Sequence, residues 1–196
     1  ERWILISEGK NKSGFRAYRD YISESSTDEP PDAELTDDDV YNIMYSSGTT
    51  GAPKGIVHTH YVRANYCTHF ASAWRMTPES IVLHAGAIVF NGAMLDLMPC
   101  MFLGATYILH HYFDAGAVLH AIIKEKVTHM VMVPSQIIAL LNHPDFEPEK
   151  LRSLEMLQNV GAPLLLEYKH KLNPMFPETA RMSSTLSMMM LLIPDF

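Results

Sequence analysis

The residues best suited to chemistry gather in residues 45–55, which read Tyr-Ser-Ser-Gly-Thr-Thr-Gly-Ala-Pro-Lys-Gly. The glycines allow sharp turns and let main-chain amides approach an anion, while the hydroxyls add donors or a metal-facing oxygen. The lysine supplies the positive charge that a triphosphate needs. We interpret this stretch as a phosphate-binding loop. Its candidate nucleotide ligands are Ser46, Ser47, Gly48, Thr49, Thr50, Gly51 and Lys54.

Neither a flexible linker nor the P-loop of common ATPases accounts for this segment as well. A linker would be equally rich in small polar residues, but it would not explain Pro53 followed by Lys54, or the strand-like segments at 40–45 and 56–60. The common P-loop requires Gly-Lys-Ser/Thr at the start of a helix, whereas here the lysine precedes a glycine and a β-branched pair. We therefore expect phosphate to be held by loop amides, hydroxyls and Lys54, without a helix dipole.

Strand-like and helix-like segments alternate beyond the loop. We expect strands at 81–84, 105–109, 127–133 and 154–160, and helices at 61–74, 92–103, 136–142 and 164–172. Asp114 is expected to cap one further helix, and Ser135 to cap the helix that starts at 136. This alternation predicts an α/β fold with a mainly parallel sheet flanked by helices.

Composition excludes several classes of function. Lys and Arg total 15 against 22 Asp and Glu, with no basic stripe, so no nucleic-acid partner is expected. Cys67 and Cys100 lack metal-ligand spacing, which favours structural thiols in a reduced, cytoplasmic setting. Residues 81–109 are apolar but interrupted, which indicates a buried strand-helix-strand rather than a transmembrane segment. Six histidines in strand-like regions are expected to be core or surface residues: His58, His60, His84, His110, His111 and His129.

Residues 45–55 closely resemble the signature of the adenylate-forming, AMP-binding superfamily, which includes acyl-CoA synthetases and peptide-synthetase adenylation domains. Ser46 departs conservatively from the usual threonine. Similarity continues through 58–60, 133–135 and 160–163, and the order between 40 and 177 is most like an acyl-CoA synthetase or fatty-acid CoA ligase. We therefore expect a partial N-terminal domain: a lead-in and acidic loop (1–39), an α/β core (40–177) and a divergent tail (178–196).

The resemblance implies a two-step reaction with ATP, magnesium and coenzyme A. A carboxylic acid, most simply a fatty acid, would form an acyl-adenylate and then a CoA thioester. Thr49 or Thr50 would face the magnesium ion, and Gly161, Ala162 and Pro163 would lie beside adenine. Phe90, Asn91 and Gly92 correspond to a Pro-x-Phe-His region of many relatives, with Phe90 in place of the histidine. Phe90 could form a wall of an acyl pocket or be a core aromatic.

The end of the chain departs from the family pattern. A Tyr-Gly-x-Thr-Glu motif and a C-terminal domain with a catalytic lysine are expected in the family, but the sequence instead becomes rich in methionine, so no catalytic residue is assigned. One permitted back-translation of residues 182–185 encodes Glu-Leu-Tyr in a shifted frame, which suggests a frame change. A divergent Met-rich segment is the alternative. The chain could accordingly be a truncated ligase that works with the missing remainder, a non-catalytic nucleotide-binding remnant, or an adenylation domain.

Overall fold

The computed structural model describes residues 3–6, 13–46, 52–172 and 181–184, and divides the chain into two units, Glu1–Leu35 and Thr36–Phe196. In the first unit, β1 (Trp3–Leu5) and β2 (Phe15–Ala17) form a parallel pair followed by the short helix α1 (Tyr18–Ser23). Residues 24–39 carry no helix or strand and are exposed throughout.

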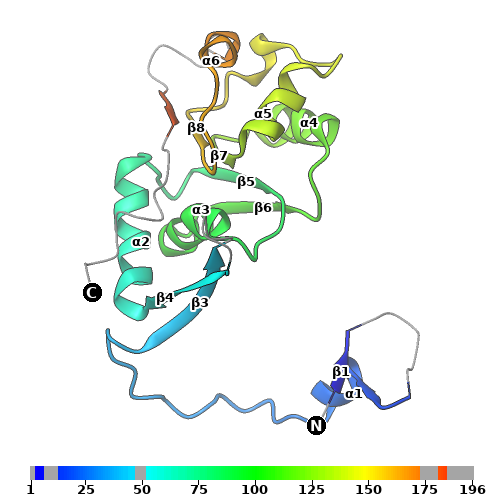
Figure 1. The fold of residues 1–196 in the computed structure, drawn as a ribbon, viewed down its shortest axis with the longest axis vertical. Helices are drawn as coiled ribbons and strands as arrows, with labels where there is room; N and C mark the ends of the chain where they lie inside the picture. The colour runs from blue at the N-terminus through cyan, green and yellow to red at the C-terminus, as the bar shows by residue number, and fades with distance from the viewer. Residues whose placement is uncertain (1–2, 7–12, 47–51, 173–180, 185–196) are drawn as a thin grey trace. The chain divides into compact units, whose positions relative to one another are not determined.

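The second unit begins with an antiparallel hairpin. Strands β3 (Val40–Ser46) and β4 (Lys54–Thr59) pair from Val40 opposite Thr59 to Ser46 opposite Lys54. Helix α2 (His60–Ala73) follows directly, and the hydroxyl of Thr59 accepts a hydrogen bond from the Val62 amide at 3.4 Å at its start. Figure 1 shows α2 beside this hairpin.

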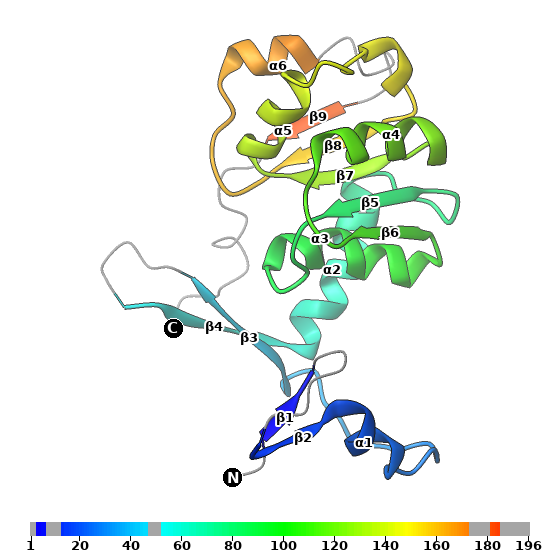
Figure 2. The same ribbon diagram turned by 90° about the vertical axis from the view of Figure 1, so that its right-hand side faces the viewer.

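The main sheet is parallel, and its five strands lie in the order β6-β5-β7-β8-β9, as Figure 2 shows. Its strands are β5 (Ile81–Ala85), β6 (Thr106–His110), β7 (His129–Met132), β8 (Met156–Asn159) and β9 (Arg181–Ser184). They are joined by α3 (Asn91–Leu103), α4 (Ala115–Glu125), α5 (Pro134–Leu141), the 3-10 turn η1 (Pro148–Leu151) and α6 (Leu166–Leu172). The predicted parallel α/β sheet flanked by helices is confirmed.

Alternate residues of the inner strands build a core on each face of the sheet. On one face, Leu83 and Met130 pack with apolar residues of α4, α5 and α6. On the other, Val82 and Val131 pack with α2 and α3, including Tyr66. Because both faces are covered, these strands are nearly continuous apolar runs, as the sequence suggested.

Helix starts follow the predicted chemistry in one case and not in another. The Asp114 carboxylate accepts a hydrogen bond from the Ala117 amide at 2.7 Å, so it caps α4 as predicted. The prediction that Ser135 caps the following helix is wrong, because α5 begins one residue earlier, at Pro134. Proline is favoured at the first helical position, where no amide hydrogen is needed, and this moves the cap to Val133.

Across the described ranges, no helix is both long and apolar enough to cross a membrane.

Candidate functional site

The hairpin β3–β4 carries the two flanks of the predicted phosphate loop. Ser46 and Lys54 are paired across its end, and Lys54 is exposed. The candidates Ser47, Gly48, Thr49, Thr50 and Gly51, and with them the proposed magnesium-facing hydroxyl, lie outside the described residues. The structure therefore places the strands that enter and leave the loop.

Gly55 differs from the sequence interpretation, which assigned it to a turning loop. It lies in β4 opposite Tyr45, and a Cβ atom there would come within 3.1 Å of Ile43 Cγ2 and 3.3 Å of the Tyr45 ring. A larger residue would push these side chains away. Gly55 therefore leaves room for side chains of the paired strand and does not form a turn.

The other predicted residues follow the carboxyl ends of β5 and β8. The neighbouring strands β5 and β7 continue into α3 and α5, which cover opposite faces of the sheet. Such a switch point at the carboxyl edge is the usual place for a ligand in an open α/β sheet. The start of α3 and the turn after β8 meet at this edge, because a Cβ atom on Gly92 would lie 3.8 Å from Val160 Cγ2.

Phe90 lies at the N-cap of α3 and is 69% exposed. The described residues of this chain therefore do not bury its ring in a core. Two further apolar side chains of the same turn, Ile88 and Val89, are also exposed, at 42% and 70%. The turn after β5 therefore presents an apolar surface beside the switch point.

Asn91, next to Phe90, is tightly bound. Its side-chain oxygen accepts a hydrogen bond from Arg63 Nη1 at 2.9 Å, and its amide group donates to the Tyr66 hydroxyl at 3.2 Å. Arg63 and Tyr66 belong to α2, so residues of α2 fix the start of α3. Sequence reasoning missed both partners, because no local pattern links residues 25 and 28 positions apart.

The adenine-side candidates Gly161, Ala162 and Pro163 form an exposed turn directly after β8. The turn is held by the buried Asn159, whose side-chain amide donates to the Ala162 carbonyl at 2.8 Å. Gly161 adopts a φ of 84°, in the left-handed region that favours glycine. The turn therefore has a defined main-chain path that neighbouring side chains do not cover.

Gln136 connects β5 to the start of α5 at the same edge. Its side-chain amide donates to the Ala85 carbonyl at 2.7 Å, and its oxygen accepts from the Val133 amide at 3.1 Å. One side chain therefore fixes the spacing between the ends of β5 and β7. No local sequence pattern predicts this connection either.

A buried polar cluster lies beneath the turn after β5. His84 Nδ1 lies 3.2 Å from one oxygen of Asp96, and the Tyr107 hydroxyl donates to the other at 3.0 Å. Burial raises the pKa of Asp96, although the contacts with His84 and Tyr107 oppose this. Burial, and then the Asp96 charge, raise the pKa of the nearby Cys100 thiol to about 11. Cys100 is accordingly an unreactive thiol.

The six histidines have varied surroundings. His129 is buried and contacts the Trp74 carbonyl at 2.9 Å, and His58 is also buried. Within the part of the chain that the structure describes, no group of three or more His, Cys, Asp or Glu residues could hold a metal ion.

A family model described as AMP-binding enzyme matches residues 4–186. Feruloyl-CoA synthase from an Amycolatopsis species is 38% identical over 143 residues, which cover 72% of this chain and 29% of that enzyme. The medium/long-chain-fatty-acid CoA ligase FadD8 from Mycobacterium tuberculosis is 33% identical over 129 residues, covering 63% of this chain and 21% of the ligase. The chain thus spans less than a third of the length of these relatives.

The fold has a similar counterpart among solved structures. O-succinylbenzoate coenzyme A synthetase (MenE) from Bacillus subtilis, in complex with ATP and magnesium ion, matches with a TM-score of 0.67 and 26% identity. The match covers 79% of this chain and 32% of that one.

Proposed function

Because the chain belongs to the AMP-binding enzyme family, as its loop motif predicted, we propose that it is a truncated part of an acyl-CoA ligase that activates a carboxylic acid with ATP. A carboxylate oxygen attacks the α-phosphorus of ATP, and the bond from that phosphorus to pyrophosphate breaks. The sulfur of coenzyme A then attacks the acyl carbon, and the bond from that carbon to the phosphate oxygen of AMP breaks. AMP leaves with the electrons of this bond, and the thiol proton is released. The observation that carries the proposal is the family match, which spans both the phosphate loop and the turn after β8.

In this proposal the phosphates are bound by Lys54, Ser46 and the loop residues 47–51, with Thr49 or Thr50 facing magnesium. Both reactants of the first step are anions, so a cation and hydrogen-bond donors must neutralise the charge that develops on phosphate. The exposed Lys54 at the hairpin end supplies such a cation. Gly161, Ala162 and Pro163 would lie beside adenine, where an uncovered main-chain turn can approach a flat base.

We propose a fatty acid as the substrate, with its chain against the turn after β5. The exposed apolar side chains of Ile88, Val89 and Phe90 support this choice, since an alkyl chain gains free energy by covering apolar surface. The name of one relative refers to fatty acids and that of another to a feruloyl group. Aromatic acids are therefore the alternative substrates against which fatty acids should be compared.

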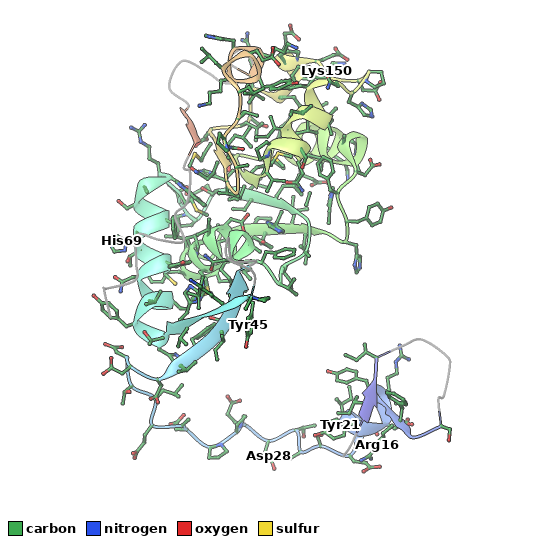
Figure 3. All side chains as sticks on the ribbon, viewed as in Figure 1. Arg16, Tyr21, Asp28, Tyr45, His69 and Lys150 are labelled. Atoms are coloured by element: carbon green, nitrogen blue, oxygen red, sulfur yellow. The ribbon has the colours of Figure 1, made fainter. Side chains whose placement is uncertain are left out.

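Nucleotide binding tests the phosphate site directly. We expect this chain to bind ATP with magnesium in isothermal titration calorimetry, and Lys54→Ala to weaken binding at least about tenfold, the scale of losing a hydrogen bond to a charged group. Lys150→Ala is the matched control, because Lys150 is also exposed and lies at the opposite end of this unit from Tyr45 (Figure 3). Equal binding by Lys54→Ala and wild type, with the fold intact by circular dichroism, would refute the site.

Exchange of labelled pyrophosphate into ATP tests the reaction. The assay uses a panel of fatty and aromatic acids, with this chain and with any longer product of the same gene. Exchange by this chain would exclude a non-catalytic remnant, whereas exchange by the longer product alone would make the chain a binding fragment. If neither protein exchanges with any acid, the proposed activity is wrong.

A further inference from the structure

Arg63 is a buried cation at the junction of three elements. It belongs to α2, is 1% exposed, and donates from Nε and Nη2 to the Asn42 side-chain oxygen, both at 3.1 Å. Its Nη1 donates to the Asn91 oxygen at 2.9 Å. Asn42 lies in β3, the strand that enters the phosphate loop, and Asn91 is the first residue of α3.

The other contacts of this guanidinium come from α2 and β3. Nη2 lies 3.4 Å from Met44 Sδ in β3, and the guanidinium carbon lies 4.8 Å from the centre of the Tyr66 ring. These acceptors are neutral amides, a thioether and an aromatic face, so no carboxylate is among the contacts that the described residues make with it. Burial, the largest influence, lowers the pKa of Arg63, but an arginine side chain remains charged in proteins.

A charge in this position is costly if packing is its only role. Removing a cation from water without an acid partner costs free energy, and an apolar side chain would fill the space at lower cost. What the guanidinium adds is geometry, since its planar fork directs rigid donors to two acceptors at once. The two acceptors lie on the strand that enters the phosphate loop and on the helix that begins beside Phe90.

We propose that Arg63 is a positioning residue that ties the strand entering the phosphate loop to the start of α3, so that nucleotide binding at the loop is transmitted to the acyl side. The inference rests on the proposed function for its two ligands. The tie itself, between β3 and α3, rests on the contacts alone. Arg63 would act on both substrates through Asn42 and Asn91, without touching either substrate.

Hydrogen–deuterium exchange with mass spectrometry tests the tie without ligand. Arg63→Lys keeps the charge but loses the fork, and Asn42→Ala removes only the β3 contact. We expect Arg63→Lys to speed amide exchange about tenfold, which corresponds to the loss of one hydrogen bond. The faster exchange should appear both in β3 and at the first amides of α3 that donate hydrogen bonds within the helix. Arg152→Lys, at an exposed position, is the control. If Arg63→Lys does not fold, Asn42→Ala decides, because faster exchange in α3 must then arise from a change in β3.

Exchange with and without ATP tests the transmission. In the wild type, ATP should slow exchange at the start of α3. In Arg63→Lys or Asn42→Ala this protection should disappear, while the dissociation constant for ATP stays within about threefold of the wild-type value, a smaller change than the loss of one hydrogen bond would cause. Protection that persists in the variants would overturn the inference, as would ATP binding by the wild type with no effect on α3. If the wild type binds no ATP, the proposed function fails, and the ligand-free comparison still decides whether Arg63 joins the two elements.

Discussion

Gly161 and Gly92 lie at the same edge of the sheet, yet an alanine should have opposite effects at the two positions. Gly161 has a φ of 84°, whereas Gly92 is the second residue of α3. A Cβ atom would meet only ordinary van der Waals neighbours in each case, Val133 Cγ1 at 3.5 Å and Val160 Cγ2 at 3.8 Å. Steric crowding is therefore similar, and backbone conformation is the difference between them.

The expected size follows from that difference. The left-handed conformation costs an alanine about 1–2 kcal/mol, and the loss of unfolded-state freedom offsets about 0.5 kcal/mol. Gly161→Ala should thus lose about 1 kcal/mol and lower Tm by about 2–4 °C for a chain of this size. Gly92→Ala, in a helix, should gain about 0.5–1 kcal/mol and raise Tm by about 1–4 °C.

Thermal unfolding followed by circular dichroism measures both variants. Gly104→Ala is a further control, because Gly104 has a φ of 71° and a Cβ atom there would meet nothing within 4 Å. Its loss should equal that of Gly161→Ala to within about 0.5 kcal/mol, the usual scatter of such comparisons. A Tm for Gly161→Ala at or above that of the wild type would refute the backbone argument, and a much larger loss than for Gly104→Ala would show that the Val133 contact dominates.

Three further predictions concern single polar side chains of the second unit. Gln136→Leu should lower Tm by about 4–8 °C, because two hydrogen bonds of about 1 kcal/mol each are lost; an unchanged Tm would show that Gln136 does not hold the two strand ends. Burial raises the pKa of Asp96, so the wild type should lose stability relative to Asp96→Asn as pH rises from 3.8 through the raised folded-state value; a constant difference in Tm across that range would contradict this. Burial, the largest influence, lowers the pKa of His129, so the wild type should lose stability as pH falls below 6.5; the loss should be smaller in His129→Gln, and an equal loss in this variant and the wild type would contradict it.

The elements of the main sheet could be predicted because their signals are local. The apolar stripe of α4 and the acidic cap at Asp114 lie within a few residues of each other. The parallel strands are short apolar runs bounded by polar residues, and periodicity detects these directly. Errors appeared where two local rules competed, as when Pro134 rather than Ser135 set the start of α5.

The candidate site could be predicted only in pieces. The loop and the turn at residues 161–163 carry recognisable motifs, but the order of the strands, which puts the start of α3 beside the turn after β8, is not encoded by any single segment. Arg63 had no signal at all, because its partners Asn42 and Asn91 lie 21 and 28 residues away on other elements. The exposure of Phe90 similarly depends on where α3 begins relative to the sheet.

The strand β9 makes the frame-change hypothesis testable in structural terms. It runs parallel to β8, with Ser184 opposite Asn159, so β8 and β9 end at the same edge of the sheet. If another reading frame supplies the Thr-Glu motif after Ser184, the motif would follow the carboxyl end of a strand that neighbours β8, whose turn we propose to lie beside adenine.

Sequencing the gene beyond this segment shows whether such a frame exists. The effect of the motif is then tested by expressing the joined product, in which the chain continues in that frame after Ser184. We expect the joined product to bind ATP with magnesium at least about tenfold more tightly than this chain, since each hydrogen bond to a charged group contributes about 1.5–3 kcal/mol. Lys54→Ala should remove most of the affinity in both proteins, because the phosphate loop is common to them. The absence of a family-like continuation in any frame, or equal affinity of the two proteins, would favour a genuinely divergent Met-rich segment.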